Sequence, residues 1–320
     1  MGVYRRVTEF DRVKIYILLG ENKSQSEIAE QVGFNKSTIS RELKRNSGER
    51  GYRHKQAHEK AVARQSHLLA ARTFSEEVKI QVTRLLKLRW SPEQISERLK
   101  LEKKSTVSHE TIYQFVYEDK CKGGSLHTFL RQGHKKRKRR FPSKKRQSKL
   151  SNVRPIQDRP IAADNRTELG HLERDLVIGK NHHKAVMTVV DRKSRYSKLV
   201  LLNGKAAKVV GEKTVEVIKT IPSKTMTNDR GLEFADHETT TAISGIKIYF
   251  CDPYSSQQRG TNENTNGLLR QYLPKGSDFS KLTDVELTKI EDELNSRPRR
   301  CLDWRTPYEV EWGVKVALTN

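Results

Sequence analysis

Three acidic residues in the second half of the chain are spaced in a way that favours phosphoryl-transfer chemistry. Asp175 lies within one predicted strand, Asp229 directly follows another, and Glu263 lies on a later predicted helix. Mg²⁺ prefers oxygen ligands, and carboxylates from separate elements can hold two such ions close together. Two ions can activate an attacking hydroxyl and stabilise the leaving oxygen of a phosphodiester. The pattern therefore predicts a site for two Mg²⁺ (or Mn²⁺) ions; the alternative is three solvated surface acids.

The residues around Asp229 and Glu263 favour the catalytic interpretation. Gly231 in TNDRGLEF permits a sharp turn at a strand end. Glu263 lies in DPYSSQQRGTNENTNGLLRQYLPKG, with Arg259 one turn before it and Arg270 two turns after it on the same helix face. A carboxylate between two arginines suits a metal ion together with a DNA phosphate, so Arg259 is a predicted DNA contact. Ion pairing on the helix surface is the alternative role for both arginines.

The elements that must position these acids alternate between strand and helix. Strands are predicted over HLERDLVIGK, AVMTVVDRKSRY and SKLVLLNG, followed by a helix over KAAKVVGEKTVEVIKTI. A strand at KTMTND, a strand at IKIYFC and a helix from Thr261 to Tyr272 complete the pattern, while residues 233–244 carry no clear signal. This order predicts an α/β domain with a mixed sheet between helices, and it resembles an RNase H-like fold.

The first 50 residues predict an all-α helix-turn-helix domain. Phe10, Val13, Ile17 and Leu18 have helical spacing and are the expected inner face of a first helix. In SQSEIAEQVGFNKSTISRELKRN, Ser24 and Glu27 form a capping-box pattern, Gly33 allows a tight turn, and a second helix follows. The residues of that last helix that are expected to face DNA are Lys36, Ser37, Thr38, Ser40, Arg41 and Lys44. A plain helical hairpin is the alternative.

A second, weaker helix-turn-helix pattern follows a helical spacer. In WSPEQISERLK, Ser91 and Pro92 mark a helix start, and Ser108 caps a further helix in VSHETIYQFVYE. Three residues of this last helix are expected to face outward toward DNA: His109, Thr111 and Gln114. A structural hairpin is again the alternative.

Positive charge is concentrated in the N-terminal half. The 320 residues contain 63 Lys and Arg against 39 Asp and Glu, and residues 1–150 carry a net charge of +20 of the total +24. The tract KKRKRRFPSKKRQSK at residues 135–149, which includes Lys136 and Arg137, contains no acid. Such a tract is expected to be a flexible arm that follows DNA phosphates, although a solubilising linker or a nuclear-localisation signal has the same composition.

Several classes of protein are excluded. No apolar run approaches the length of a membrane span, and the start of the chain has no signal-peptide pattern. The three cysteines are far apart, which argues against disulfides or a cysteine zinc site. We expect Cys251 and Cys301 to be buried, Trp304 and Trp312 to lie in the core, and Asp191 to order a turn. Glu173 is a possible spare metal ligand, because it shares a strand face with Asp175.

The sequence resembles DDE transposases of the insertion sequence 30 family along essentially its whole length. The segments that carry the resemblance are LLGENKSQSEIAEQVGFNKSTISRELKRN, WSPEQISERL with VSHETIY, DLVIGK, VVDRKSRY, NDRGLEF, DPYSSQQRGTNENTNGLLRQYLPKG and LNSRPRRCLDWRTPYEV. The 33 residues between Asp229 and Glu263 match the spacing of the family. The resemblance implies that Asp175, Asp229 and Glu263 are the catalytic triad and that Arg270 is the basic catalytic residue seven positions after the Glu.

Departures from the family pattern lie close to the chemistry. Leu172 and Arg174 replace a Trp and a Gly around the first Asp, and Arg230 replaces an Asn after the second. Gln257 and Gln258 replace a Trp–Glu pair before Arg259. Arg174 and Arg230 beside two metal ligands would weaken metal binding or change substrate preference, so an inactive copy is the alternative to an active enzyme.

The resulting expectation is a DNA transposase of the bacterial cytoplasm, associated with the nucleoid. Its domains are residues 1–50 (helix-turn-helix), 51–133 (helical spacer and second helix-turn-helix), 134–160 (basic linker) and 161–320 (catalytic domain). Its partners are double-stranded DNA, both terminal inverted repeats and target, and further copies of itself in a dimer or larger synaptic assembly, with no membrane partner. The alternatives are a catalytically inactive relic that acts as a DNA-binding regulator, and a nuclease that cleaves but does not join.

Overall fold

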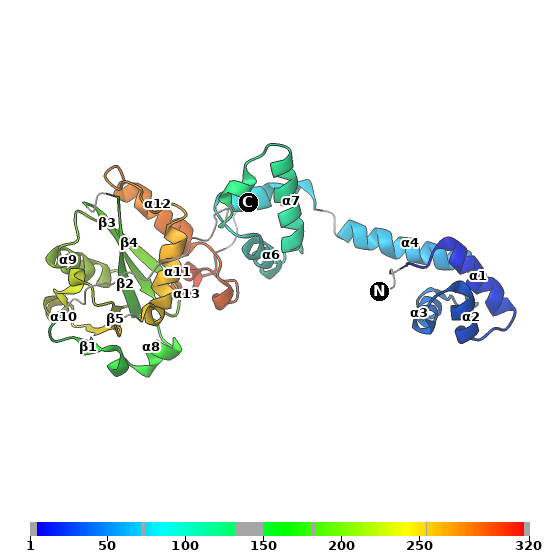
Figure 1. The fold of residues 1–320 in the computed structure, drawn as a ribbon, viewed down its shortest axis with the longest axis horizontal. Helices are drawn as coiled ribbons and strands as arrows, with labels where there is room; N and C mark the ends of the chain where they lie inside the picture. The colour runs from blue at the N-terminus through cyan, green and yellow to red at the C-terminus, as the bar shows by residue number, and fades with distance from the viewer. Residues whose placement is uncertain (1–4, 72–73, 132–149, 181–182, 254, 317–320) are drawn as a thin grey trace. The chain divides into compact units, whose positions relative to one another are not determined.

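The computed structural model describes residues 5–71, 74–131, 150–180, 183–253 and 255–316 (Figure 1). The chain divides into two compact units, Met1–Ser75 and Glu76–Asn320. Most of the predicted linker, including the basic tract with Lys136 and Arg137, lies outside the described residues.

The first unit has the predicted helix-turn-helix arrangement. It contains α1 (Glu9–Gly20), α2 (Gln25–Val32), α3 (Lys36–Asn46) and α4 (His54–Ala71). Ser24 and Glu27 form the expected capping box at the start of α2. Gly33 ends α2 with φ at 75°, a left-handed conformation that favours glycine, and Asn35 then caps α3. The predicted turn between these two helices is confirmed.

The inner face of α1 differs from the prediction. Ile15 is fully buried against α2 and α3, whereas Phe10 and Ile17 are exposed. The helix carries apolar residues on several sides, so their spacing alone does not select the face that packs. The face is fixed by a buried ion pair, in which Arg12 donates to Glu42 of α3 at 2.8 Å.

The second unit begins with the second set of helices. These are α5 (Glu76–Lys87), α6 (Pro92–Leu101) and α7 (His109–Cys121), with Ser91 and Ser108 as the caps of α6 and α7. Their buried side chains include Leu86, Ile95 and Ile112. The predicted helices are confirmed, and they pack together through these apolar residues.

A mixed sheet follows, with strand order β1-β6-β5-β2-β3-β4. The strands are β1 (Arg154–Pro155), β2 (His171–Ile178), β3 (Ala185–Asp191), β4 (Ser197–Leu202), β5 (Thr225–Asn228) and β6 (Lys247–Phe250). β2, β3 and β4 form an antiparallel meander, while β5 and β6 run parallel to β2. This is the predicted RNase H-like arrangement with a mixed sheet, and the short edge strand β1 is an addition that the sequence did not indicate.

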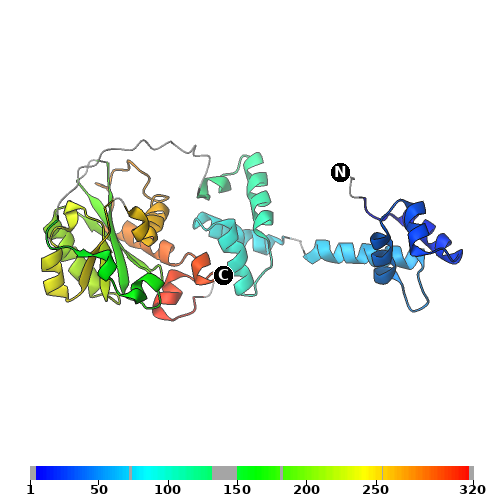
Figure 2. The ribbon, with the colours of Figure 1, turned by 60° about the horizontal axis from the view of Figure 1, so that its bottom comes forward.

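Helices cover both faces of this sheet (Figures 1 and 2). The helices are α8 (Ile161–Asn165), α9 (Ala207–Ile218), α10 (His237–Ser244), α11 (Gly260–Leu269), α12 (Asp284–Asn295) and α13 (Pro307–Trp312). One face packs Met187 and Val189 of β3 with α9, and the other packs Val186 with α11 and α12. Residues 233–244, which carry no clear sequence signal, contain α10, and α11 ends three residues before the predicted Tyr272.

The second set of helices packs against the C-terminal part of its unit. Arg98 of α6 is buried and donates two hydrogen bonds of 2.7 Å to Glu309 of α13. Gln94 of α6 donates to the backbone carbonyl of Pro298 at 2.7 Å. Residues 76–131 therefore share one compact unit with the sheet.

The smaller expectations are confirmed only in part. Cys251 is buried, whereas Cys301 is exposed, because it lies in a short turn at the surface. Trp312 is also exposed at its edge and packs on Tyr196 with ring centroids 5.9 Å apart. Asp191 orders a turn as expected, since its carboxylate accepts from the backbone N–H groups of Lys193 and Ser194.

Candidate active site and DNA-contacting surfaces

The register of β2 and β5 brings Asp175 and Asp229 side by side. Glu173 of β2 is paired with Thr227 of the parallel strand β5. Two residues further along, β2 reaches Asp175 and the β5 segment reaches Asp229. Because β2 is paired on both edges, it holds Asp175 in the middle of the sheet, whereas Asp229 lies just beyond the end of its strand.

Arg259 connects these two carboxylates. Its guanidinium donates to Oδ2 of Asp229 at 2.8 Å, and its Nη1 lies 3.4 Å from Oδ1 of Asp175. The side chain of Arg259 is only 11% exposed, against 26% for Asp175 and 40% for Asp229. A positive group thus lies between the two acids that were predicted to bind metal, and the predicted DNA contact Arg259 is an ion-pair partner in this structure.

Burial and like charge raise the pKa of Asp175. Burial is the largest cause, and the nearby Asp229 adds to it, while Arg259 opposes both. Two further hydrogen bonds hold the Asp175 carboxylate: the backbone N–H of Leu176 donates to Oδ1 and the amide of Asn266 donates to Oδ2, each at 2.9 Å. The ionised form of Asp175 therefore depends on a positive partner at this position.

Glu263 does not join the two aspartates in this structure. It lies on the exposed side of α11, one turn after Arg259. Within the described ranges, no three acidic, histidine or cysteine side chains converge as a metal centre would require. Arg270, just beyond the end of α11, donates to the backbone carbonyls of Leu273 and Pro274 and is half-buried, which lowers its pKa.

The structure gives Glu173 a structural role in place of the possible role as a spare ligand. Its carboxylate is fully buried, forms an ion pair with Arg192, and accepts from the backbone N–H of Asn262 at 2.8 Å. Asn262 is fully buried too, and its side chain is hydrogen-bonded to Thr188 of β3. These contacts fix the start of α11 against the sheet, and with it the positions of Arg259 and Asn266.

Sequence reasoning did not find Asn262 and Asn266. The Asn-rich stretch around Glu263 was the available signal, because buried amides near carboxylates need hydrogen-bond partners. Which of those asparagines face the sheet follows only from the orientation of α11, which the sequence pattern did not give.

The two arginines next to the aspartates contact other parts of the domain. Arg174 alternates with Asp175 along β2 and lies under Phe234, with its guanidinium 4.5 Å from the ring centroid. It donates to Asn228 at 3.2 Å and also to Thr214, and burial lowers its pKa to about 9. Arg230 donates to the backbone carbonyl of Cys251 at 3.1 Å. Neither guanidinium contacts Asp175 through any hydrogen bond or ion pair between the described residues.

The first helix-turn-helix exposes the predicted DNA-facing side chains on α3. Ile39 is fully buried, and Leu43 packs partly against the same core. The residues on the remaining faces are exposed except for Thr38, which is half-buried: Lys36, Ser37, Thr38, Ser40, Arg41 and Lys44. Among the described residues, the helix therefore presents a polar and basic surface.

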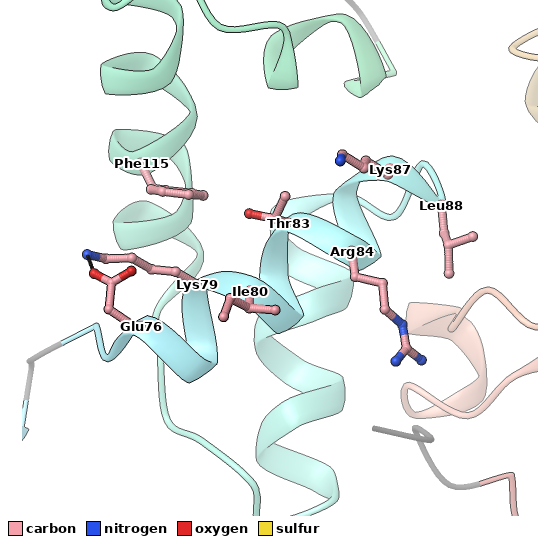
Figure 3. A pocket seen from close by; sticks show the side chains of 8 residues that line it. All are labelled: Glu76, Lys79, Ile80, Thr83, Arg84, Lys87, Leu88 and Phe115. Carbon is pink, nitrogen blue, oxygen red and sulfur yellow. Dashed lines mark hydrogen bonds and ion pairs between the residues drawn. The ribbon is translucent and has the colours of Figure 1, made fainter.

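On α7, His109 and Gln114 are exposed, and Thr111 is half-buried next to the Ser108 hydroxyl, 2.9 Å away. An open groove of about 620 Å³ lies beside α5 and α7 (Figure 3). Ile80, Thr83 and Phe115 line it together with basic side chains, and its acid, Glu76, is ion-paired with Lys79 at 2.6 Å. This groove contains none of the predicted catalytic carboxylates.

The chain is similar to transposases along nearly its whole length. It is 39% identical over 309 residues to the transposase for insertion sequence element IS4351 of Bacteroides fragilis, a match that covers 95% of each chain. It is 39% identical over 333 residues to transposase InsI for insertion sequence element IS30A of Escherichia coli (strain K12), covering 98% of this chain and 85% of that one. The chain belongs to the insertion sequence 30 family of transposases.

Two further comparisons concern separate parts of this transposase. A helix-turn-helix domain family matches residues 3–46, which include α1, α2 and α3. Among solved structures, the catalytic core domain of BIV integrase is similar, with a TM-score of 0.37 and 19% identity, over 45% of this chain and 93% of that one.

Membership of this family makes the chain a DDE phosphoryl-transfer enzyme that binds DNA through its helix-turn-helix domain. Enzymes of this class use divalent metal ions. No helix in the part of the chain that the structure describes is long and apolar enough to cross a membrane.

Proposed function

We propose that this transposase binds the terminal inverted repeats of its own insertion sequence, cuts the DNA strand at the element ends and joins the freed ends to target DNA. The observation that carries this proposal is the meeting of Asp175 and Asp229 around a positive group at the centre of the sheet. Two carboxylates so placed accept a cation with their oxygen atoms, which are the ligands that Mg²⁺ prefers.

The donor set fits divalent metal ions. Asp175 and Asp229 are the first two ligands, and Glu263 of α11 is the third, reached by a change from the exposed position that it has here. Bound ions, two Mg²⁺ (or Mn²⁺), supply activation of the attacking hydroxyl and stabilisation of the leaving oxygen. Asn266 keeps the Asp175 carboxylate in place through its 2.9 Å hydrogen bond.

Arg259 and Arg270 are the groups of the chain that hold the reacting phosphate. Both lie on or next to α11, on either side of Glu263, and guanidinium groups bind phosphate oxygens in pairs. In the cutting step, water attacks phosphorus at the element end and the 3′-oxygen leaves as a free hydroxyl. In the joining step, that 3′-hydroxyl attacks a target phosphodiester and the 3′-oxygen of the target leaves, so one phosphodiester bond replaces another. This exchange needs no nucleotide cofactor, in agreement with the absence of phosphate-loop motifs from the sequence.

The other parts of the chain have roles in DNA binding. The exposed face of α3 reads the terminal repeat, with Lys36, Arg41 and Lys44 as its basic residues. His109, Thr111 and Gln114 of α7, and the tract with Lys136 and Arg137, contact flanking DNA. Two element ends must be cut together, so the active form is a dimer or a larger synaptic assembly on the bacterial nucleoid, in the cytoplasm.

The test uses the full chain, Mn²⁺, and DNA that carries the gene with its flanks. We expect new 3′ ends at the element boundaries and joined products with the unaltered protein and with a Glu212→Gln control on the exposed side of α9, but not with Glu263→Gln. Cleavage without joining would instead support a nuclease. Boundary binding without cleavage by any of the three proteins would support a DNA-binding regulator and overturn the proposal.

A further inference from the structure

A second cluster of arginines lies on the side of α11 away from Asp175. A pocket of about 170 Å³ opens there, lined by the first two residues of α11 and by side chains from three loops. Its lining includes Arg166, Arg195 and Arg299, together with Asn264 and Cys301. We call this the arginine pocket.

In the described part of the chain, no carboxylate is paired directly with the arginines of this pocket. No ion pair joins Arg166, Arg195 or Arg299 to a carboxylate within the described ranges. Their hydrogen bonds go to neutral groups: Arg195 donates to the Thr261 hydroxyl and Arg299 to the backbone carbonyl of Leu294, both at 2.9 Å. Arg299 is held in place by burial, with only 8% of it exposed.

Burial and nearby positive charges disfavour the charged forms of Arg166 and Arg299. Burial lowers the pKa of Arg299 to about 9, and the neighbouring positive charge of Arg297 adds to the effect. Burial also lowers the pKa of Arg166, with Arg195 as the next cause. A fourth cation, Arg131, donates to Asn264 at 3.4 Å and contributes to the same effect on Arg299. An anion in the pocket would offset these positive charges.

The backbone is strained at two of the arginines that line the pocket. Arg166 and Arg195 have φ values of 55° and 64°, in the left-handed region where residues other than glycine are uncommon. Strain of this kind persists where the surrounding structure requires it, often at a binding site. Here it brings two like charges from separate loops to one pocket.

We propose that the arginine pocket binds a backbone phosphate of the DNA strand that leads to or from the reacting phosphodiester. Several converging guanidinium groups match the tetrahedral oxygens of a phosphate. The helix start at Gly260 and Thr261 adds a partial positive charge. Gly260 and Asn264 lie three residues before and one residue after Glu263, so the pocket is next to the predicted catalytic carboxylate along the same helix.

This assignment rests on the proposed function, since it needs DNA at the face of α11. The first test measures binding of an element end by the full chain, without divalent metal ions, as salt concentration is varied. Arg166→Asn combined with Arg195→Asn removes two charges, and Asn tolerates the left-handed backbone better than most residues. The matched control is Lys208→Gln with Lys219→Gln, two exposed cations at α9 on the opposite face of the sheet.

We expect the arginine double variant to bind roughly tenfold more weakly, as for the loss of a charged hydrogen bond. The slope of log affinity against log salt should also decrease by about one for each phosphate that the variant no longer binds. The lysine control should keep both the affinity and the slope of the unaltered protein. Equal affinity and slope for all three proteins would overturn the proposal.

The second test uses Cys301, an exposed thiol that lines the pocket. DNA carrying a short disulfide-activated tether on one backbone phosphate at a time is incubated with a Cys121→Ser variant, so that Cys301 is the exposed thiol that remains in the described residues. Exchange of the tether disulfide with Cys301 should occur at one or two adjacent phosphates near the element boundary, and Cys301→Ser should abolish it. Crosslinking at no position, or equally at all positions, would contradict the assignment.

These outcomes separate the pocket from the proposed function. Position-specific crosslinking by a protein that does not cut the element ends would support the pocket and overturn the catalytic proposal. If the arginine double variant cuts the element ends normally and no crosslink forms, the result would support the catalytic proposal and overturn the pocket assignment. Inorganic phosphate that stabilises the protein through Arg166 and Arg195, without any DNA crosslink, would identify a site for a free anion and overturn the DNA assignment.

Discussion

Replacing Arg259 with Gln is predicted to strengthen divalent metal binding. In the structure the guanidinium is in contact with oxygens of both Asp175 and Asp229, at 3.4 and 2.8 Å. A metal ion needs the same oxygens, so Arg259 must release them first. Removing the guanidinium removes this competition, although it also leaves two carboxylates without a positive partner when no metal is present.

The size of the effect follows from the exposure of the pair. A hydrogen bond between charged groups contributes about 1.5–3 kcal/mol, and solvent screening keeps this one near the lower value. Asp229 is 40% exposed and Asp175 is 26% exposed. Avoiding that cost corresponds to roughly tenfold tighter metal binding, or about 1.4 kcal/mol of additional stabilisation at saturating metal. For a unit of this size, we expect the metal-induced rise in Tm to be larger by roughly 3–6 °C.

Calorimetric unfolding of the full chain with and without Mn²⁺ measures this rise. Arg259→Gln should unfold at a lower temperature than the unaltered protein without metal, and should gain more from Mn²⁺. Arg270→Gln is the control, because Arg270 donates to backbone carbonyls and contacts neither aspartate. Asp175→Asn should abolish the metal response in either background. A metal-induced rise in Arg259→Gln equal to or below that of the unaltered protein would refute the competition.

Three further predictions concern stability and DNA binding. Burial would raise the pKa of Glu309, but hydrogen bonds led by those of Arg98 lower it to about 2. This lowering of the pKa of Glu309 corresponds to about 3 kcal/mol of stability, which is present above pH ~4.5 and lost as the pH falls through ~2. Acid unfolding curves of Glu309→Gln should therefore lack this part of the pH dependence. Arg41→Gln should leave Tm unchanged but weaken binding to the terminal repeat and lower the salt slope by about one, as fluorescence anisotropy would show. Arg174→Gly should lower the free energy of unfolding by about 2–4 kcal/mol by leaving a cavity beneath Phe234, while the Mn²⁺-induced rise in Tm stays the same; a larger rise would show that Arg174 hinders metal binding.

Local sequence patterns predicted helices, strands and turns correctly where a pattern is compatible with only one backbone conformation. The capping box at Ser24 and the turn at Gly33 each fix a backbone conformation within a few residues, and both are found as expected. Strands β2 to β6 were also recovered, most clearly β3 and β4, which are mainly apolar runs between turns, whereas the two-residue strand β1 was not. The predicted inner face of α1 was wrong, because that face is fixed by a buried ion pair between Arg12 and Glu42, which are thirty positions apart in the sequence.

The sequence was sufficient to predict which residues form the candidate site, but not how their side chains contact one another. Spacing and resemblance identify Asp175, Asp229 and Glu263, and the parallel register of β2 and β5 brings the first two together. The contact of Arg259 with both aspartates depends on how α11 is rotated against the sheet. That rotation is fixed by the buried Glu173 and Asn262, a long-range hydrogen bond that has no periodic signal in the sequence.

Helix α11 lies between two groups of arginines that have different kinds of partner. On the sheet side, Arg259 is neutralised by the aspartates, while on the other side Arg195 and Arg299 donate to neutral groups. In the proposed function, a DNA strand that crosses this helix would bring phosphates to both sides, and a phosphate that draws Arg259 away from Asp229 would free the oxygens proposed to bind metal. Because coupling of two binding equilibria is reciprocal, metal bound at the aspartates, as we propose, would in turn release Arg259 for the phosphate. In this structure, without DNA, Arg259 is the positive partner of both carboxylates, so the sheet tolerates two adjacent acids at its centre.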